Sequence, residues 1–374
     1  MKQTTKKRVT SVLAIAMTVL LAFPLGSAHV EARTELAMDD YDDIVSTYSV
    51  DDSVLDYKDY VNNFNGVYPD KSITVGAESC VRYDENDEET EPVIYKDYEG
   101  MSGDSLYTSE NSLIEFEVDV KEEGFYNISL EYFPVKGKNS AIERSVFIDG
   151  ELPYSELAMV TFYRIWEYDI DSYTADNGSK AYNWEKDNQG NDCKPSMKEN
   201  PEWVNEYMYD SDGYVTSPLS VYMTKGKHTI TLLSMREPMV IHSLTLSNAA
   251  DKLSYAQVKS ENDAAGVKNT SGKLITIEGE NPTRTSSQML YPIQDQSSPS
   301  VSPSSAKMLL NNTIGGNSWR LVGQWVEWDF DVDESGYYNI SLYDCQNYVR
   351  GIYVSRKITI DGVVPFKELE AYGF

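Results

Sequence analysis

The sequence predicts an all-β protein made of two tandem β-sandwich domains, the second incomplete, which a short helical linker joins. Residues 113–120 and 325–332 alternate apolar and polar side chains with period two, as half-buried strands do. An Asp-Gly pair after an apolar run, at residues 149–150 and 361–362, predicts a hairpin turn. The side chains expected to point into the two cores are Ile114, Phe116, Val118 and Val120 in one segment and Val326, Trp328, Phe330 and Val332 in the other.

The third observation is an internal repeat, in which residues 115–157 align with residues 327–369 without a gap. Chance does not explain so many identities in one register, so we predict two copies of one fold. The identical pairs include Asp119/Asp331, Val120/Val332, Gly124/Gly336, Tyr126/Tyr338, the Asn-Ile-Ser-Leu run, Arg144/Arg356, Asp149/Asp361, Gly150/Gly362, Pro153/Pro365 and Glu156/Glu368.

The N-terminal residues 1–32 have the pattern of a secretory signal peptide. A basic start is followed by an apolar run over residues 9–25, and Ala28 and Ala32 are small residues at which cleavage fits. We therefore expect an extracellular or cell-surface protein, with an uncleaved N-terminal anchor as the alternative. Residues 33–69 form an acidic, Tyr-rich leader that fits an amphipathic helix or a disordered segment.

The first sandwich is expected over residues 70–250, with an insertion at about residues 157–217. Strands that begin at Gly226 and end near Asn248 close this domain, and residues 251–269 are predicted to form the linker helix. The second sandwich is expected over residues 270–374. Because the sequence after Leu369 holds no counterpart of those closing strands, we expect this domain to be truncated and the chain to be a fragment of a larger protein.

The composition narrows the function. A net charge of −28 disfavours nucleic acid and anionic membranes as partners. Three widely spaced cysteines are no disulfide framework. No nucleophile, zinc-protease or phosphate-binding motif accompanies the three histidines, so we expect no enzymatic activity, although carboxylates are too numerous to exclude a glycosidase pair.

The order of motifs resembles a known family. A strand that ends in Glu is followed by W-x-E-aromatic-x-apolar-x-V, a G-(Tyr/Phe)-Tyr strand, an apolar-Asp-Gly hairpin and G-K-H-T-apolar. This order is similar to carbohydrate-binding modules of families 6 and 35, which are galactose-binding-like, jelly-roll β-sandwiches. The resemblance covers residues 72–248, apart from the insertion, and residues 272–374 as an incomplete copy.

The resemblance implies a structural calcium ion held by two glutamates on the first strand of the domain. The second copy offers Glu278 and Glu280, whose spacing on a strand places both carboxylates on one face, where they suit a hard cation. The first copy departs from the family, because Gly76 stands where the first glutamate is expected and only Glu78 remains. Ordinary surface carboxylates are the alternative.

Sugar binding needs an open aromatic face beside hydrogen-bonding groups. Trp325 is expected on the face opposite Val326, near a Gly/Asn-rich loop that carries Trp319, with Asn347 and Tyr348 on a neighbouring strand end. We therefore predict carbohydrate binding by Trp319, Trp325, Asn347 and Tyr348, with packing under a loop as the alternative. For Trp166, Trp184 and Trp203 of the insertion, packing against their own domain is the favoured interpretation.

Together these observations predict a secreted, monomeric, non-catalytic protein that binds a polysaccharide or oligosaccharide. One alternative is the N-terminal part of an extracellular solute-binding protein of a sugar ABC transporter, which would have membrane transporter components as partners. A second alternative is the accessory region of a truncated glycoside hydrolase.

Overall fold

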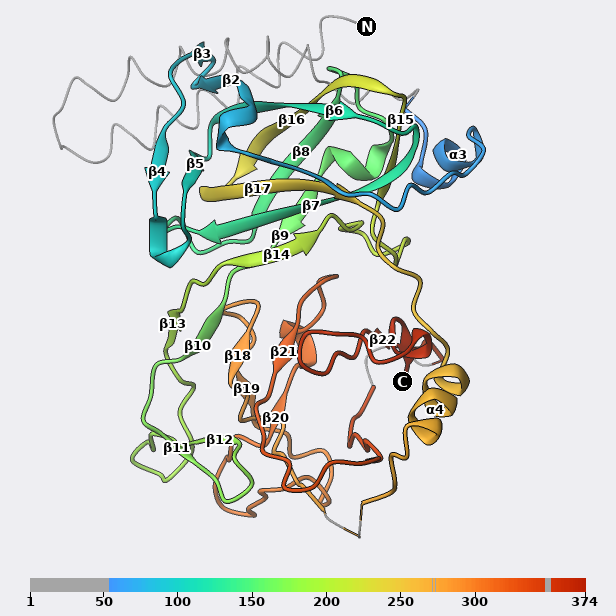
Figure 1. The fold of residues 1–374 in the computed structure, drawn as a ribbon. Coiled ribbons are helices and arrows are strands. Elements are labelled where there is room, and N and C mark those ends of the chain that lie inside the picture. The colour runs from blue at the N-terminus through green and yellow to red at the C-terminus, as the bar shows by residue number, and fades with distance from the viewer. Residues whose placement is uncertain (1–53, 271, 273, 347–350) are drawn as a thin grey trace, which may run out of the picture. The chain divides into compact units, whose positions relative to one another are not determined.

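A computed structural model describes residues 54–270, 272, 274–346 and 351–374. These residues belong to one compact unit (Figure 1). The predicted signal peptide and the leader up to residue 53 lie outside the described residues. Within the described ranges, no helix combines the length and the hydropathy that a membrane span requires.

Two antiparallel sheets form a β-sandwich within residues 73–247. The seven-stranded sheet has the order β14 (Val204–Tyr207), β7 (Gly124–Pro134), β17 (Met239–Ser247), β5 (Asp104–Thr108) and β4 (Ile94–Lys96), while β1 (Ile73–Gly76) also pairs with β17 and β15 (Ser220–Met223) with β7. The six-stranded sheet has the order β3 (Glu88–Glu89), β2 (Cys80–Glu85), β6 (Ser112–Val120), β16 (Gly226–Arg236), β8 (Ile142–Ile148) and β9 (Val160–Phe162).

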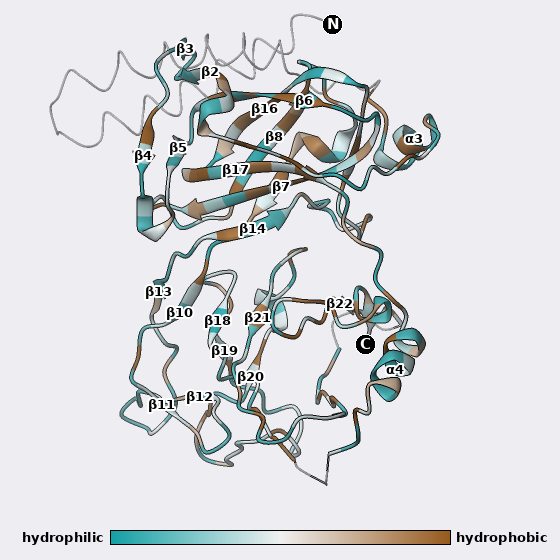
Figure 2. Cartoon of the chain, viewed as in Figure 1, coloured by the Kyte–Doolittle hydropathy of each residue, from teal (hydrophilic) through white to brown (hydrophobic). Residues whose placement is uncertain are grey.

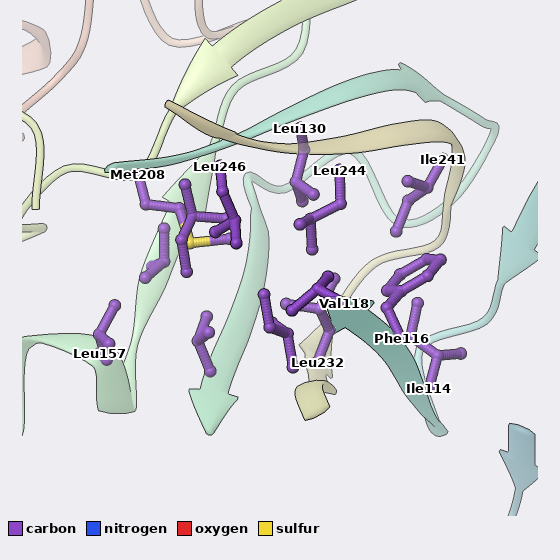
Figure 3. Packing of buried hydrophobic residues seen from close by; sticks show 14 of the residues in the cluster. Ile114, Phe116, Val118, Leu130, Leu157, Met208, Leu232, Ile241, Leu244 and Leu246 are labelled. Carbon is purple, nitrogen blue, oxygen red and sulfur yellow. The ribbon is translucent and has the colours of Figure 1, made fainter. Parts of the chain in front are cut away.

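The hydrophobic core lies between these two sheets (Figure 3). Phe116 and Val118 of β6 face Leu130 of β7 and Leu244 of β17, and each of these side chains is at most 1% exposed. The predicted alternation of residues 114–120 is therefore confirmed, and so is the all-β class. The apolar residues of Figure 2 follow the same strands.

The remaining described strands are short. A four-stranded sheet has the order β13 (Met197–Glu199), β10 (Trp166–Tyr168), β18 (Arg284–Thr285) and β21 (Val326–Glu327), so strands of the insertion pair with strands of the second copy (Figure 1). Three two-stranded sheets pair β11 (Ser172–Thr174) with β12 (Lys180–Tyr182), β19 (Pro292–Ile293) with β20 (Thr313–Ile314), and β22 (Ser355–Arg356) with β23 (Tyr372–Gly373).

The second copy does not form the long strand expected over residues 325–332. Only Val326 and Glu327 pair, while Phe330 is 39% exposed and Val332 is 48% exposed. In the first copy β6 is held between β2 and β16 and packs against the seven-stranded sheet, whereas Val326 and Glu327 of the second copy pair with the two residues of β18. That residues 270–374 adopt a second sandwich stays a prediction.

The described residues contain two α-helices, α3 (Tyr57–Asn62) and α4 (Tyr255–Ala264), and α4 lies within the predicted linker. Each helix begins at a capped N-terminus, where Asp56 accepts from the backbone N–H of Asp59 and Ser254 forms a capping box with Gln257. Both caps follow from the residue types present at those positions.

The two helices make the same contacts with their own copies of the repeat. The Tyr57 N–H donates to Glu156 Oε2 at 2.9 Å, and the Tyr255 N–H donates to Glu368 Oε2 at 2.9 Å. After the helices, Val67 O accepts from the Phe125 N–H at 2.8 Å, as Lys268 O accepts from Tyr337 at 2.9 Å. The repeat therefore extends upstream to include a helix, which the aligned segment alone does not reveal.

Candidate functional site

The sequence-predicted sugar residues are only partly brought together. The Trp319 indole N–H donates to Gln324 O at 3.0 Å, and the guanidinium carbon of Arg356 lies 4.6 Å from the Trp319 ring centroid. The backbone N–H of Trp325 donates to Ser286 Oγ at 2.9 Å, and its side chain is half-buried. Asn347 and Tyr348 lie outside the described residues, so this site stays a prediction.

The predicted calcium ligands lie in a turn rather than on a strand. The Asn281 N–H donates to Glu278 O at 3.1 Å, and Glu278 is exposed whereas Glu280 is 3% exposed. Burial, followed by the nearby carboxylates of Glu278 and Asp192, raises the pKa of Glu280 to about 7. One Glu280 oxygen, Oε2, is buried without a hydrogen-bond partner.

A calcium site would need further oxygen ligands around this carboxylate. The described ranges contain no group of three His, Cys, Asp or Glu side chains placed to share a metal ion, so these residues as arranged do not assemble the implied site. In the first copy Glu78 accepts from the Gly76 N–H at 3.2 Å and is exposed. Calcium binding stays a prediction for both copies.

A different cluster of side chains has the character of a binding surface. We call it the aromatic patch, and it consists of Tyr95 in β4, Tyr98 just after β4, Tyr107 in β5, Trp203 just before β14, and His242 in β17. Each of these side chains is partly exposed. Four of its members come from one sheet or its immediate ends, and Trp203 comes from the end of the insertion.

The aromatic patch lies on the face of the seven-stranded sheet that points away from the core. Ile241 and Leu244 of β17 belong to the core cluster, and His242 between them does not. In β7, Tyr132 belongs to the core cluster, whereas the ring of the next residue, Phe133, lies 5.5 Å from Trp203. Strand alternation, with a register shift in β17 between Ile241 and Ser243, therefore places the patch residues on the outer face.

The rings of the patch contact one another in a continuous series. The Tyr95 and Tyr98 rings are stacked at 5.0 Å, and Tyr107 lies 5.8 Å from Tyr95. Trp203 meets Tyr98 edge to face at 6.4 Å and His242 edge to face at 5.9 Å. Offset and edge-to-face contacts are the arrangements that aromatic rings prefer.

The backbone that carries Tyr98 is strained. Asp97 and Glu99, on either side of it, have φ values of 49° and 45°, in the left-handed region that non-glycine residues rarely adopt. The turn is held by Asp97, whose Oδ1 accepts from the Gly103 N–H at 2.9 Å and whose own N–H donates to Gly103 O at 2.8 Å. Strain of this kind concentrates at binding sites, because the surrounding structure must maintain it.

Polar groups border the rings. His242 Nδ1 lies 3.1 Å from Ser105 Oγ, and the hydroxyl of Ser243 donates to Glu131 Oε2 at 3.3 Å. Burial raises the pKa values of the Tyr98 and Tyr107 hydroxyls. A phenol hydroxyl can both donate and accept a hydrogen bond. The surface thus combines apolar ring faces with donors and acceptors.

A polar cavity of about 290 Å³ lies where three loops of the sandwich meet. It is lined by Glu110, Asn111, Lys138, Ser140, Met235, Arg236 and Glu237. Its charged groups already have partners: Lys138 pairs with Glu110, and the fully buried Glu237 pairs with Arg164 at 2.8 Å. Because this cavity has no aromatic wall, it suits a sugar ring less well than the aromatic patch does.

One arrangement resembles part of a catalytic triad. His228 Nδ1 lies 2.7 Å from Asp149 Oδ2, and His228 Nε2 lies 3.3 Å from the hydroxyl of Thr224. However, Nε2 also lies 2.9 Å from the backbone oxygen of Thr224, so both ring nitrogens have partners within the turn. This histidine therefore ties the Asp-Gly hairpin to the start of β16.

The sequence favours packing for Trp203 and does not single out Tyr95, Tyr98 or Tyr107. The indole N–H of Trp203 does donate to Tyr98 O at 3.2 Å, so the ring packs and remains partly exposed at once. A signal was present in the Tyr-rich run of residues 95–107. Only the pairing of β14 with β7 shows that Trp203 lies beside these tyrosines.

No protein-family model and no curated protein matches the chain. Among solved structures, the chain is similar to the "GH26-CBM35 beta-(1,4)-mannanase" of Podospora anserina, at 13% identity and a TM-score of 0.27, over 49% of this chain and 29% of that one.

Two isolated family 35 carbohydrate-binding modules are also similar to it. The module of Abf62 from Cellvibrio japonicus has 13% identity and a TM-score of 0.28, over 48% of this chain and 95% of the module. The module from Clostridium thermocellum has 12% identity and a TM-score of 0.25, over 48% and 99%. At these identities and TM-scores, the similarities do not assign a function.

Proposed function

We propose that this protein binds carbohydrate without acting on it, and that the aromatic patch is the binding surface. The observation that supports this proposal is the series of contacting, partly exposed rings on the outer face of the seven-stranded sheet, bordered by hydroxyl, imidazole and carboxylate groups. Sugar rings present C–H faces that pack on aromatic rings and hydroxyls that need such polar partners.

The shape of the surface suits an extended chain. Its residues come from four strands or their ends and belong to a sheet face rather than to an enclosed cavity. We therefore expect recognition of internal residues of a polysaccharide or oligosaccharide rather than of a free monosaccharide.

The wider setting is also part of the proposal. Residues 1–32 would direct export, and the protein would act outside the cell as a monomer. Its two repeats would form tandem domains with boundaries near residues 70–250 and 270–374. In the two alternatives the same surface would bind the sugar. The bound sugar would then pass to a membrane transporter in one case and to a glycoside hydrolase in the other.

The test is affinity electrophoresis of the whole chain in gels that contain soluble β-1,3-glucan, β-1,4-mannan, xylan or pullulan. We expect retardation in at least one gel and a loss of affinity of about tenfold or more for Trp203→Ala and Tyr98→Ala, because buried aromatic contacts dominate binding energy. The control is Tyr214→Ala, which removes a tyrosine that is 88% exposed and does not belong to the aromatic patch. Retardation that survives both patch substitutions would refute the proposed surface.

A further inference from the structure

We propose that Arg284 of the second copy is a positioning residue for Trp203, so that the second copy supports the sugar-binding surface of the first. This inference rests on the proposed function, since Trp203 belongs to the aromatic patch. Its basis is the path of the chain between two sheets.

Residues 200–203 connect the four-stranded sheet with the seven-stranded sheet. The chain leaves β13, which pairs with β10, and after these four residues enters β14, which pairs with β7. The Asn200 N–H donates to Ile165 O at 2.9 Å, which holds the start of the connection beside β10. With so short a connection, Trp203 is sensitive to the position of both sheets.

Arg284 joins this connection to the second copy. Its Nη1 donates to Glu202 Oε2 at 2.8 Å, and its Nε donates to Glu327 Oε1 at 2.9 Å. Arg284 and Glu327 are directly opposite each other in β18 and β21. One guanidinium therefore bridges two carboxylates from different parts of the chain, using the fork geometry that lysine lacks.

The bridge lies one residue before Trp203, and β18 pairs with β10 through Thr285 and Trp166. The second copy thus contacts the connection through the ion pair, and it pairs through β18 with β10, the strand beside β13 (Figure 1). An isolated exposed ion pair contributes little, but here the Arg284 side chain is 30% exposed and Arg284 lies opposite its second partner, Glu327, in the ladder of β18 and β21. The physical consequence is a narrower range of positions for Glu202 and, through it, for the Trp203 ring.

The test uses the whole chain with Glu202→Ala, Arg284→Ala and Arg284→Lys. Hydrogen exchange of the amides of residues 202–204 and retardation in the polysaccharide gels are measured together with the unfolding temperature. We expect Glu202→Ala, which leaves the Arg284–Glu327 pair intact, to speed exchange at these amides and to weaken binding about fivefold. Arg284→Lys should lose less protection and less binding than Arg284→Ala does, because lysine keeps the positive charge. The control Arg320→Ala should behave like the native chain.

Glu202→Ala with native exchange at residues 202–204 and native retardation would overturn the inference. If the native chain is retarded in no gel, the proposed function fails, and the exchange data alone decide whether Arg284 positions Trp203. If Trp203→Ala abolishes retardation while Glu202→Ala and Arg284→Ala change neither readout, the proposed function stands and this inference fails.

Discussion

At the scale of single residues, the repeated glycines have a steric reason. A Cβ atom on Gly124 would lie 2.6 Å from Val67 O, and one on Gly336 would lie 2.5 Å from Lys268 O. Both distances are shorter than any real contact, so the backbone that precedes each copy can approach only because no side chain is present. The identity of Gly124 and Gly336 in the repeat therefore has its reason in this close approach.

Glu206 in β14 provides a test at the same scale. Burial raises its pKa to about 7, and the positive charge of Lys357 and a hydrogen bond from Tyr132 offset only part of that effect. The unfolded value is about 4.3. Between these two values the folded chain holds a proton that the unfolded chain releases, so stability is lost as the pH rises through about 7.

We therefore expect Glu206→Gln to raise the unfolding temperature more at pH 8 than at pH 5, as measured by thermal denaturation followed by circular dichroism. The substitution Glu91→Gln, at an exposed position, serves as the control, because surface substitutions change stability little. An equal change at both pH values for Glu206→Gln would show that its carboxylate is not destabilising in the folded state.

At the scale of elements, α3 and α4 are equivalent. Each begins two residues after a leucine whose oxygen accepts from the repeat, Leu55 O from the Ser155 N–H at 2.9 Å and Leu253 O from the Lys367 N–H at 2.8 Å. A helix this short is marginal on its own, so these contacts help to hold it. The helix α4 is thus both the connection between the copies and the first element of the second.

This equivalence can be tested by removing the carboxylate that accepts from the first backbone N–H of each helix. Glu156→Ala and Glu368→Ala should each destabilise the adjacent helix by about 1 kcal/mol, because an N-terminal backbone N–H loses its acceptor. Hydrogen exchange of residues 57–62 and 255–264 measures both effects in one experiment. Glu156→Ala should speed exchange in α3 alone, and Glu368→Ala in α4 alone. Faster exchange in the other helix would contradict the equivalence of the two contacts.

At the scale of the whole molecule, identical residues of the two copies have different burial. Val120 is 0% exposed in the core of the sandwich, whereas its counterpart Val332 is 48% exposed. The difference arises because the seven-stranded sheet covers the core face of β6, and nothing equivalent among the described residues covers Val332.

We expect Val120→Ala to lower the free energy of unfolding by about 2 kcal/mol, since it removes buried methyl groups and leaves a cavity. Val332→Ala should change it by less than about 0.5 kcal/mol, as surface substitutions do. Urea denaturation of the whole chain measures both values. Equal losses would mean that Val332 is buried in solution.

Prediction from the sequence succeeded where one segment carries its own signal. The alternation of residues 114–120 identified a strand because period two places one face in the core. The same pattern in residues 326–332 produced only the two-residue strand β21, because a long strand also needs neighbours that complete its ladder and cover its apolar face.

The sequence by itself determined the all-β class and the internal repeat, since each depends on residue types at fixed spacing. Only the tertiary structure decided that Trp203 lies beside Tyr98 and His242 and that Arg284 bridges Glu202 and Glu327. The physical reason is that these contacts join residues far apart in the chain, and strand pairing and register, which no local pattern specifies, bring them together.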